Sequence, residues 1–471
     1  MGKIKEKIKI ENILCLFIII CPILDIMSFL WRNTFNISFS PSTIIRPIIP
    51  IALLIYLFFK ENKKLKIAIL ITGLVYLIYG LVHLIFFQKV RTGISYSTVT
   101  HEAQYLVNYT FMILNLFIYM YIFKDKDVEI LKKSVVISAS IYIISIFISI
   151  LTGTSSPTYI EGIGYKGWFE SGNSIGTILI LSMFIYISYI KDKTYRKFVI
   201  PLIVLIGIYL TTMLGTRVGL LGFVLIIIIY AVVEIVYNIL HKLTVNKKTI
   251  LLTIFSICTI LLVIITVGST TIQRRKHLKE IQKNIVDSNT SSESHVTGSI
   301  LEIKEKIDNN MIENGYMSKA EEKSIIELYN IANKLEIRNN DQRMQQLIYN
   351  IVLVKNQKDI GLILFGNGYL NNYRELVLEM EIPAFLFNFG IVGFILYFLP
   401  FLAIFLYALY VGIRNIRKID EEYVLLFIGA GFVFAISFFA GYTFFNSSTM
   451  MIIITINTLL FNKIIKLKKE N

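Results

Sequence analysis

The stretch Ile13–Trp31, ILCLFIIICPILDIMSFLW, contains a single charged residue, Asp25, and follows a segment rich in lysine. About 20 predominantly apolar residues form a helix long enough to cross the hydrocarbon core of a bilayer. The stretch therefore predicts a helix that spans a membrane.

Similar stretches recur along the 471-residue chain, each followed by a lysine-rich run or a short polar turn. This alternation predicts an all-α, polytopic membrane protein with about 12 transmembrane helices. The predicted spans are Ile13–Trp31, Ser42–Phe59, Ile67–Phe87, Tyr105–Phe123, Val135–Leu151, Ser174–Ile190, Phe198–Leu214, Val218–Leu240, Thr249–Val267, Pro383–Val411, Tyr423–Phe439 and Ser447–Phe461.

Positive charge is concentrated in the loops on one side of these helices. If the N-terminus is inside, the inner loops hold 26 of the 47 Lys and Arg residues. The short outer loops hold only Arg32, Lys89, Arg91, Lys166 and Arg217. Because cytoplasmic loops carry an excess of Lys and Arg, both termini are expected in the cytoplasm. The same asymmetry accounts for most of the net charge of +15, so no nucleic-acid partner is expected.

Residues 268–382 are the one large departure from the alternation, and the inside–outside count places them on the extracytoplasmic face. The expected organisation is a transmembrane bundle at 1–267, a helical extracytoplasmic loop at 268–382, and transmembrane helices at 383–471. Within the loop, Ser318 and Glu321 form a capping-box pattern that predicts the start of a helix. The residues expected to share one face of that helix are Ile325, Leu328, Ala332 and Leu335. A second amphipathic helix is expected from Asp341 to about Lys355.

Polar groups inside predicted spans cost free energy and need a partner or a function. Asp25 and Arg46 lie in the first two spans, where the helices could pair them. An internal ion pair that joins two helices is the preferred interpretation, and a substrate contact is the alternative. His83 is interpreted as a hydrogen-bonded histidine of the core rather than a ligand.

Two stretches place chemistry at the predicted outer boundary. The tight turn Gly215-Thr216-Arg217 presents an arginine, whose planar guanidinium suits phosphate oxygens. An arginine that reaches toward lipid headgroups is the simpler interpretation of that turn. Later in the chain, Gly366-Asn367-Gly368 precedes Arg374, Glu379 and Glu381, and then a span with Gly390 and Gly393. The two glycines predict a close approach to a neighbouring element.

At these residues the chain resembles the O-antigen ligase and polymerase superfamily of bacterial polysaccharide assembly. The resemblance covers nearly the whole chain and is carried by the Gly215-Thr216-Arg217 turn, the long loop that ends in Gly366-Asn367-Gly368, and the stretch from Glu379 to Gly393. The stretch from Lys166 to Asn173 is also similar to members from Gram-positive bacteria. Ligases of the family have a histidine eleven residues before the first of two glycines, and here that position is Glu379. This difference favours a polymerase over a ligase.

The resemblance implies a GT-C-like, metal-independent glycosyltransferase without a cofactor, located in the bacterial plasma membrane. It would polymerise or ligate polyprenyl-diphosphate-linked repeat units on the outer face, as in O-antigen, capsule or teichuronic-type polymers. Its partners would be the lipid-linked glycan donor, a glycan acceptor, membrane lipid and other polysaccharide-assembly proteins. The residues expected to act in catalysis are Glu379, Arg217 and Glu381. The residues expected to bind diphosphate or sugar are Arg217, Arg374, Lys166 and Arg91.

A transporter of the same lipid-linked oligosaccharide, such as a flippase, is the alternative function. Transporters commonly show internal repeats and interrupted helices around a site near the bilayer midplane. Here the polar groups gather near the predicted outer boundary, and one large loop lies on one side only. That asymmetry favours an enzyme.

The topology is tested by a cysteine placed at Ser292, within the expected outer loop. A Ser292→Cys variant is expected to react with an impermeant thiol reagent in intact cells whose wall admits the reagent. Labelling that appears only after lysis would show that the loop lies in the cytoplasm, opposite to the predicted orientation.

Overall fold

The computed structural model describes residues 9–37, 40–92, 97–159, 162–190, 196–240, 268–288, 299–313, 317–335, 337, 341–369 and 376–469. Of residues 241–267 it describes only Ile254, Cys258, Leu261 and Ile264. The helices of the first half are α1 (Ile10–Phe35), α2 (Pro41–Lys60), α3 (Lys63–Val90), α4 (Val99–Phe123), α5 (Glu129–Leu151), α6 (Gly172–Ile190), α7 (Arg196–Ile208), the π-helix η1 (Tyr209–Met213) and α8 (Arg217–Leu240). Those of the second half are α10 (Thr270–Ser288), α11 (Ser299–Asp308), α12 (Lys319–Lys334), α13 (Gln342–Gln357), α14 (Ile360–Phe365), α15 (Glu381–Tyr397), α16 (Leu399–Arg414), α17 (Glu421–Phe439) and α18 (Ser447–Lys469). The strands β1 (Ser156–Pro157) and β2 (Tyr165–Gly167) pair antiparallel, with Ser156 opposite Gly167.

The all-α, polytopic membrane fold is confirmed. In the described part of the chain, nine helices are long and apolar enough to cross a membrane, and the bent pair α15–α16 brings the number to ten. The predicted span Phe198–Leu214 is a shorter apolar helix, Phe198–Met213. The predicted span Thr249–Val267 lies outside the described residues apart from the four named above.

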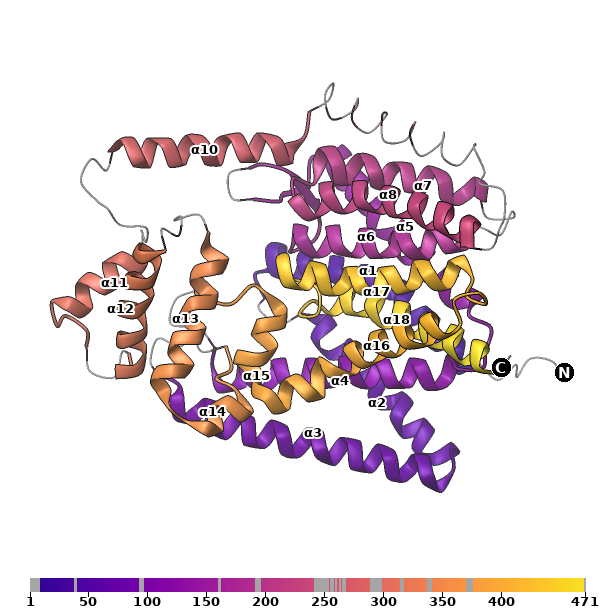
Figure 1. Ribbon diagram of the computed structural model, residues 1–471, viewed down its shortest axis with the longest axis horizontal. Helices are drawn as coiled ribbons and strands as arrows, with labels where there is room; N and C mark the ends of the chain where they lie inside the picture. Colours follow the sequence, from indigo (N-terminus) through magenta and orange to yellow (C-terminus); the bar gives the residue numbers. More distant parts are fainter. Residues whose placement is uncertain are drawn as a thin grey trace.

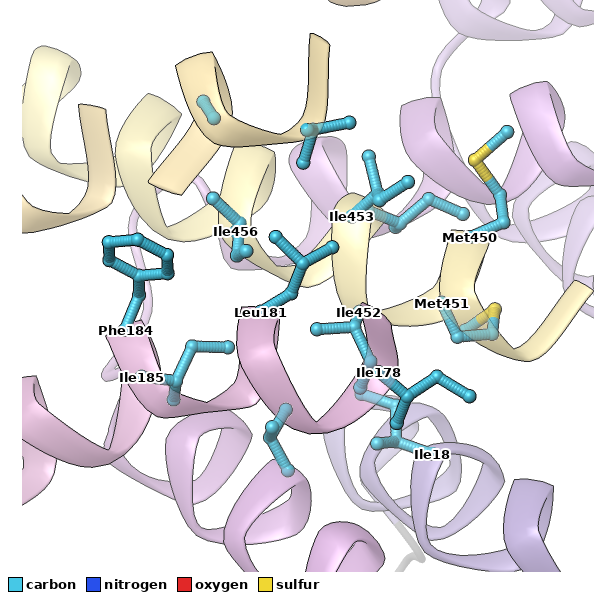
Figure 2. Packing of buried hydrophobic residues seen from close by; sticks show 14 of the residues in the cluster. Ile18, Ile178, Leu181, Phe184, Ile185, Met450, Met451, Ile452, Ile453 and Ile456 are labelled. Atoms are coloured by element: carbon cyan, nitrogen blue, oxygen red, sulfur yellow. The ribbon is translucent and has the colours of Figure 1, made fainter. Parts of the chain in front are cut away.

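The centre of the bundle is formed by α6 and α18, from the middle and the end of the chain. Their apolar windows are 83% and 78% buried, whereas those of α2 and α3 are only 22% and 17% buried. Figure 2 shows Leu181 and Ile185 of α6 packed close to Ile452 and Ile456 of α18. The inner helices are thus surrounded by protein, and the outer pair presents apolar side chains to lipid.

Charged side chains meet at one end of the bundle. The Glu422 carboxylate accepts contacts from Lys132 at 2.5 Å and Lys463 at 2.6 Å, and Ser188 donates a hydrogen bond to it at 2.8 Å. Close by in sequence, Lys469 at the end of α18 pairs with Asp125 between α4 and α5. The lysine-rich loops 60–63, 124–129 and 414–421 therefore share the end at which α18 terminates, on the right of Figure 1.

The predicted span Pro383–Val411 is wrong as a single helix. Its two halves, α15 and α16, meet at an angle of 47°. Pro400 lies in the first turn of α16, where a proline ring is accepted because the first N–H groups of a helix have no partner inside it. A second break lies inside α15, where Gly390 has φ 69 and ψ −176.

The loop after α14 satisfies the carbonyl groups that the break at Gly390 sets free. Asn367 N–H donates to the Phe387 carbonyl at 3.0 Å, and Gly368 N–H donates to the Asn388 carbonyl at 2.8 Å. The Tyr79 hydroxyl donates to the next carbonyl, that of Phe389, at 2.7 Å. Unpaired backbone groups are costly inside a bilayer, so these bonds make the break possible.

The close approach predicted for Gly390 and Gly393 is confirmed. A Cβ atom on Gly390 would collide with the Leu364 carbonyl, and one on Gly393 would collide with the Tyr79 hydroxyl. Glycine is required at both positions because backbone from the end of α14 and a ring from α3 occupy the space.

Helices α11, α12 and α13 lie beyond the end of the bundle opposite to the cluster formed by Glu422, Lys132 and Lys463 (Figure 1). They share a small core of their own, and the capping box of Ser318 and Glu321 is confirmed at the start of α12.

Ile325, Leu328 and Ala332 are fully buried, but Leu335 is 62% exposed. The prediction for Leu335 is wrong because α12 ends at Lys334 and Leu335 is its C-cap, outside the periodic face. The second predicted helix is present as α13, capped by Asp341.

Replacement of Gly390 by alanine tests the broken helix. The Gly390→Ala variant is expected to lose roughly 2 kcal/mol or more of stability, because alanine is strained at positive φ and its methyl group has no space. Gly80→Ala is the control, since nothing lies within 4 Å of a Cβ atom there. Thermal unfolding in detergent measures both, and equal melting temperatures for the two variants would contradict this interpretation.

Candidate functional site

A cavity of about 860 Å³ opens at the end of the bundle opposite to the cluster of Glu422, Lys132 and Lys463. Five helices, α1, α2, α4, α6 and α18, and two connections enclose it. The side chains that line it from α1, α2 and α4 are Asp25, Ser28, Arg32, Ser42, Thr43, Arg46, His101, Gln104, Tyr105 and Asn108. The remaining lining residues are Thr158, Tyr159, Phe169, Glu170, Ser171, Gly172, Asn173, Ser174, Ile175, Ile178, Tyr442, Phe445, Asn446 and Ser447.

Asp25 and Arg46 form an ion pair in the wall of this cavity, as the sequence predicted. Arg46 Nη2 lies 2.5 Å from Asp25 Oδ1 and donates a second bond to Ser448 Oγ at 2.6 Å. The Tyr142 hydroxyl donates to the other Asp25 oxygen at 2.5 Å. Helices α1, α2, α5 and α18 therefore meet around the Asp25–Arg46 ion pair.

Arg46 retains hydrogen-bonding capacity beyond that pair. Its Nε–H is buried and has no hydrogen-bond partner among the residues that the structure describes. The side chain is 11% exposed, so it is desolvated yet borders the cavity. A cation held in this way can bind an anionic group that enters the cavity.

The rim of the cavity is formed by the connection between α5 and α6. Arg32 Nη1 pairs with Glu170 at 2.8 Å, with both side chains close to half exposed. The Lys166 ammonium donates to the Glu170 carbonyl at 3.0 Å, and partial burial lowers the pKa of Lys166. The Thr158 hydroxyl donates to the Leu214 carbonyl at 2.8 Å, which docks this connection on the turn before α8.

The turn between α17 and α18 closes another side, and Glu381 holds it. This fully buried carboxylate accepts backbone N–H bonds from Thr443 at 2.6 Å, Phe444 at 2.8 Å and Phe445 at 2.9 Å. Asn446 then caps α18 by accepting from Thr449 N–H at 2.9 Å. A single buried carboxylate thus fixes the backbone that carries the cavity residues of this turn.

A second buried pair fixes the loop after α14. His83 Nδ1–H donates to the Phe365 carbonyl at 2.5 Å, and His83 Nε2 lies 2.9 Å from Glu102. The other Glu102 oxygen accepts from Tyr369 N–H at 3.1 Å. The interpretation of His83 as a hydrogen-bonded core histidine is confirmed, since its ring is fully buried.

The two glutamates expected to act in catalysis lie beside the cavity but do not line it. Glu379 pairs with Arg343 Nε at 3.1 Å, and Arg343 also donates to the Phe439 and Ala440 carbonyls at the end of α17. Glu381 faces the backbone of 443–445 as described above.

The three expected cations that the structure describes lie on different elements: Arg91 follows α3, Lys166 is in β2, and Arg217 begins α8. Arg217 is exposed at the start of α8, and the structure shows no polar partner for it among the described residues. Arg91 is exposed and donates to the Ser97 carbonyl at 3.4 Å. Lys166 lies next to the rim, and Arg374 lies outside the described residues.

Arg32, Gln104, Asn108 and Asn173 line the cavity, but no sequence motif marks them as site residues. They come from helices far apart in the sequence, so no local motif joins them. The available signal was the position of Asp25 and Arg46 within apolar spans, because intramembrane charge commonly marks a functional site. Within the described ranges, no three His, Cys, Asp or Glu side chains gather as a metal site.

The family model of the O-antigen ligase-like membrane proteins matches residues 7–470. The chain belongs to this family. Comparison with curated proteins and with solved structures finds no significant match. Membership indicates a membrane enzyme of polysaccharide assembly, with lipid-linked glycans as the implied class of substrate.

The Asp25–Arg46 pair is tested by a double-mutant cycle on stability. Asp25→Asn leaves Arg46 without its counter-charge and is expected to cost about 2 kcal/mol or more. Adding Arg46→Gln removes the unpaired charge, so the double variant should be more stable than Asp25→Asn alone. Melting temperatures in detergent measure this, and strictly additive losses would show that the two side chains are not coupled.

Proposed function

We propose that this protein transfers a glycan from a polyprenyl-diphosphate donor to an acceptor hydroxyl at the outer face of the plasma membrane. The acceptor is a second lipid-linked repeat unit, so the product is a longer polymer. The observation that supports this most directly is the polar cavity at one end of the bundle, with the buried Arg46 guanidinium in its wall.

The composition of the cavity suits such a substrate. Amide side chains from Gln104, Asn108 and Asn173 can both donate hydrogen bonds to sugar hydroxyls and accept them. Arginine binds phosphate oxygens through two parallel N–H bonds, which favours Arg46 and Arg32 as the diphosphate ligands. The polyprenol remains in the bilayer, beside the lipid-facing surface of α2.

The proposed reaction breaks one bond and forms another at the same carbon atom. The acceptor oxygen attacks the anomeric carbon, the bond from that carbon to the diphosphate oxygen breaks, and the diphosphate leaves on its polyprenol. Nearby cations stabilise the charge that develops on the leaving group. The proton of the acceptor hydroxyl passes to a carboxylate.

Three carboxylates are candidates for the base. The family resemblance points to Glu379, with Glu381 as the second choice. Asp25 is favoured by position, since its carboxylate lines the cavity, whereas Glu379 pairs with Arg343 outside it. We propose Asp25 as the base and Arg46 as the principal diphosphate ligand, with Arg217 and Arg374 as the alternative cations.

The alternative function is transport of the same lipid-linked glycan. Membership of a family of polysaccharide-assembly enzymes argues against it. The polar cavity also opens at one end of the bundle, whereas transporters typically bind substrate near the midplane.

Polymerisation by purified protein, with lipid-linked repeat units and gel analysis of chain length, tests the assignment. Arg46→Lys keeps the charge but loses the planar fork, so the rate is expected to fall about 100-fold. Arg217→Lys, a matched change outside the cavity, is expected to retain most activity. The reverse result would assign the diphosphate to Arg217.

The same assay compares Asp25 with Glu379 as the base. Asp25→Asn is expected to abolish polymerisation, and the Asp25→Asn, Arg46→Gln double variant should remain inactive although it regains stability. Glu379→Gln should leave chain length nearly unchanged. An inactive Glu379→Gln beside an active Asp25→Asn would instead support the residue suggested by the resemblance.

A further inference from the structure

Tyr442 holds a backbone conformation that a bulky side chain rarely adopts. Its φ is 60°, and it follows Gly441, whose φ is 70°. Among the described residues, the other non-glycine positions with positive φ are Asn36, Asn310 and Lys358, so Tyr442 is the only aromatic residue of this group. Such conformations persist only where the surroundings impose them, and they cluster at ligand sites.

The surroundings impose this conformation from both sides. Before Tyr442, a Cβ atom on Gly441 would collide with the Glu379 carbonyl, so only glycine fits. After it, the three N–H bonds to Glu381 fix residues 443–445. The residues on both sides of Tyr442 thus hold its backbone in place.

The turn carries two aromatic residues that line the cavity, and they differ in their surroundings. The ring centroid of Phe445 lies 4.8 Å from that of Phe385 and 5.2 Å from that of Tyr109, within the aromatic core. Tyr442 is 45% exposed at the cavity wall. A rigid turn thus presents one accessible ring to a cavity that is otherwise rich in amide and hydroxyl groups.

We propose that the Tyr442 ring is the platform on which a sugar ring of the lipid-linked glycan stacks, and that Glu381 is the positioning residue that holds it there. This inference rests on the proposed function. A pyranose ring has faces made of C–H groups, which pack favourably on the negative face of an aromatic ring. Its hydroxyl groups point outward from the ring edge, where Gln104 and Asn108 on α4 can reach them. An isoprenoid chain would require an apolar groove, whereas this cavity is lined mainly by polar side chains.

Binding of two lipids to the full-length protein in nanodiscs tests the platform. One probe is undecaprenyl diphosphate without sugar, and the other is the lipid-linked glycan extracted from cells that produce the protein. Tyr442→Asn removes the ring, and asparagine tolerates positive φ better than tyrosine. It is expected to weaken binding of the glycan lipid by about 3- to 10-fold and to leave binding of the sugar-free lipid unchanged.

Tyr442→Phe is the matched control because it keeps the ring and removes only the hydroxyl group. Its affinity for both lipids is expected to stay within about twofold of the original. Glu381→Gln weakens the hydrogen bonds that fix residues 443–445. Like Tyr442→Asn, it should therefore reduce the affinity for the glycan lipid. The thermal stability of Tyr442→Asn is expected to equal or exceed that of the original protein, because the backbone strain is relieved.

Each other outcome overturns the platform. An unchanged affinity of Tyr442→Asn for the glycan lipid, or a failure of this variant to fold, would show that the ring has no sugar contact or only a structural role. An equal loss for both lipids would assign the ring to the diphosphate or the polyprenol and leave the proposed function standing. If the original protein binds neither lipid, the proposed function fails together with the platform.

Discussion

The architecture depends on one constraint, the need of every backbone polar group inside a bilayer for a partner within the protein. Most helices satisfy it by themselves. Helix α15 does not, because it breaks at Gly390, and its freed carbonyl groups at 387–389 accept bonds from Asn367, Gly368 and Tyr79. The loop after α14 is therefore part of the membrane fold, although it lies in the long segment between spans.

The same constraint explains the two buried glutamates that face backbone. Glu381 accepts three N–H groups of the turn before α18, and Glu102 accepts the N–H of Tyr369. A buried carboxylate without such bonds would be very costly, and a buried turn without a carboxylate would leave its N–H groups unpaired. Each glutamate and its backbone partners thus stabilise one another, and together they hold irregular backbone at the predicted outer end of the bundle.

The buried ion pairs at the two ends of the bundle differ in whether they leave hydrogen-bonding capacity unused. At the lysine-rich end, Glu422 is surrounded by Lys132 and Lys463 in a closed cluster. At the other end, the Asp25–Arg46 pair leaves a buried N–H of Arg46 without a described partner and borders a cavity. The first arrangement joins helices. The second joins helices and also retains capacity to bind an anion, which is the basis of the proposed diphosphate site.

The sequence by itself determined the class of fold, the family resemblance, the pairing of Asp25 with Arg46, and the start of α12. Each of these depends on local composition or on spacing along the chain, which hydropathy and helical periodicity express directly. The bend between α15 and α16, the exposure of Leu335 and the members of the cavity could not be predicted in this way. They depend on which helices become neighbours, and α1, α4, α6 and α18 contribute to one cavity from positions hundreds of residues apart. Only the tertiary structure placed Glu379 beside Arg343, Glu381 against the backbone of residues 443–445, and the ring of Tyr442 at the cavity wall, because those contacts arise from packing between distant segments.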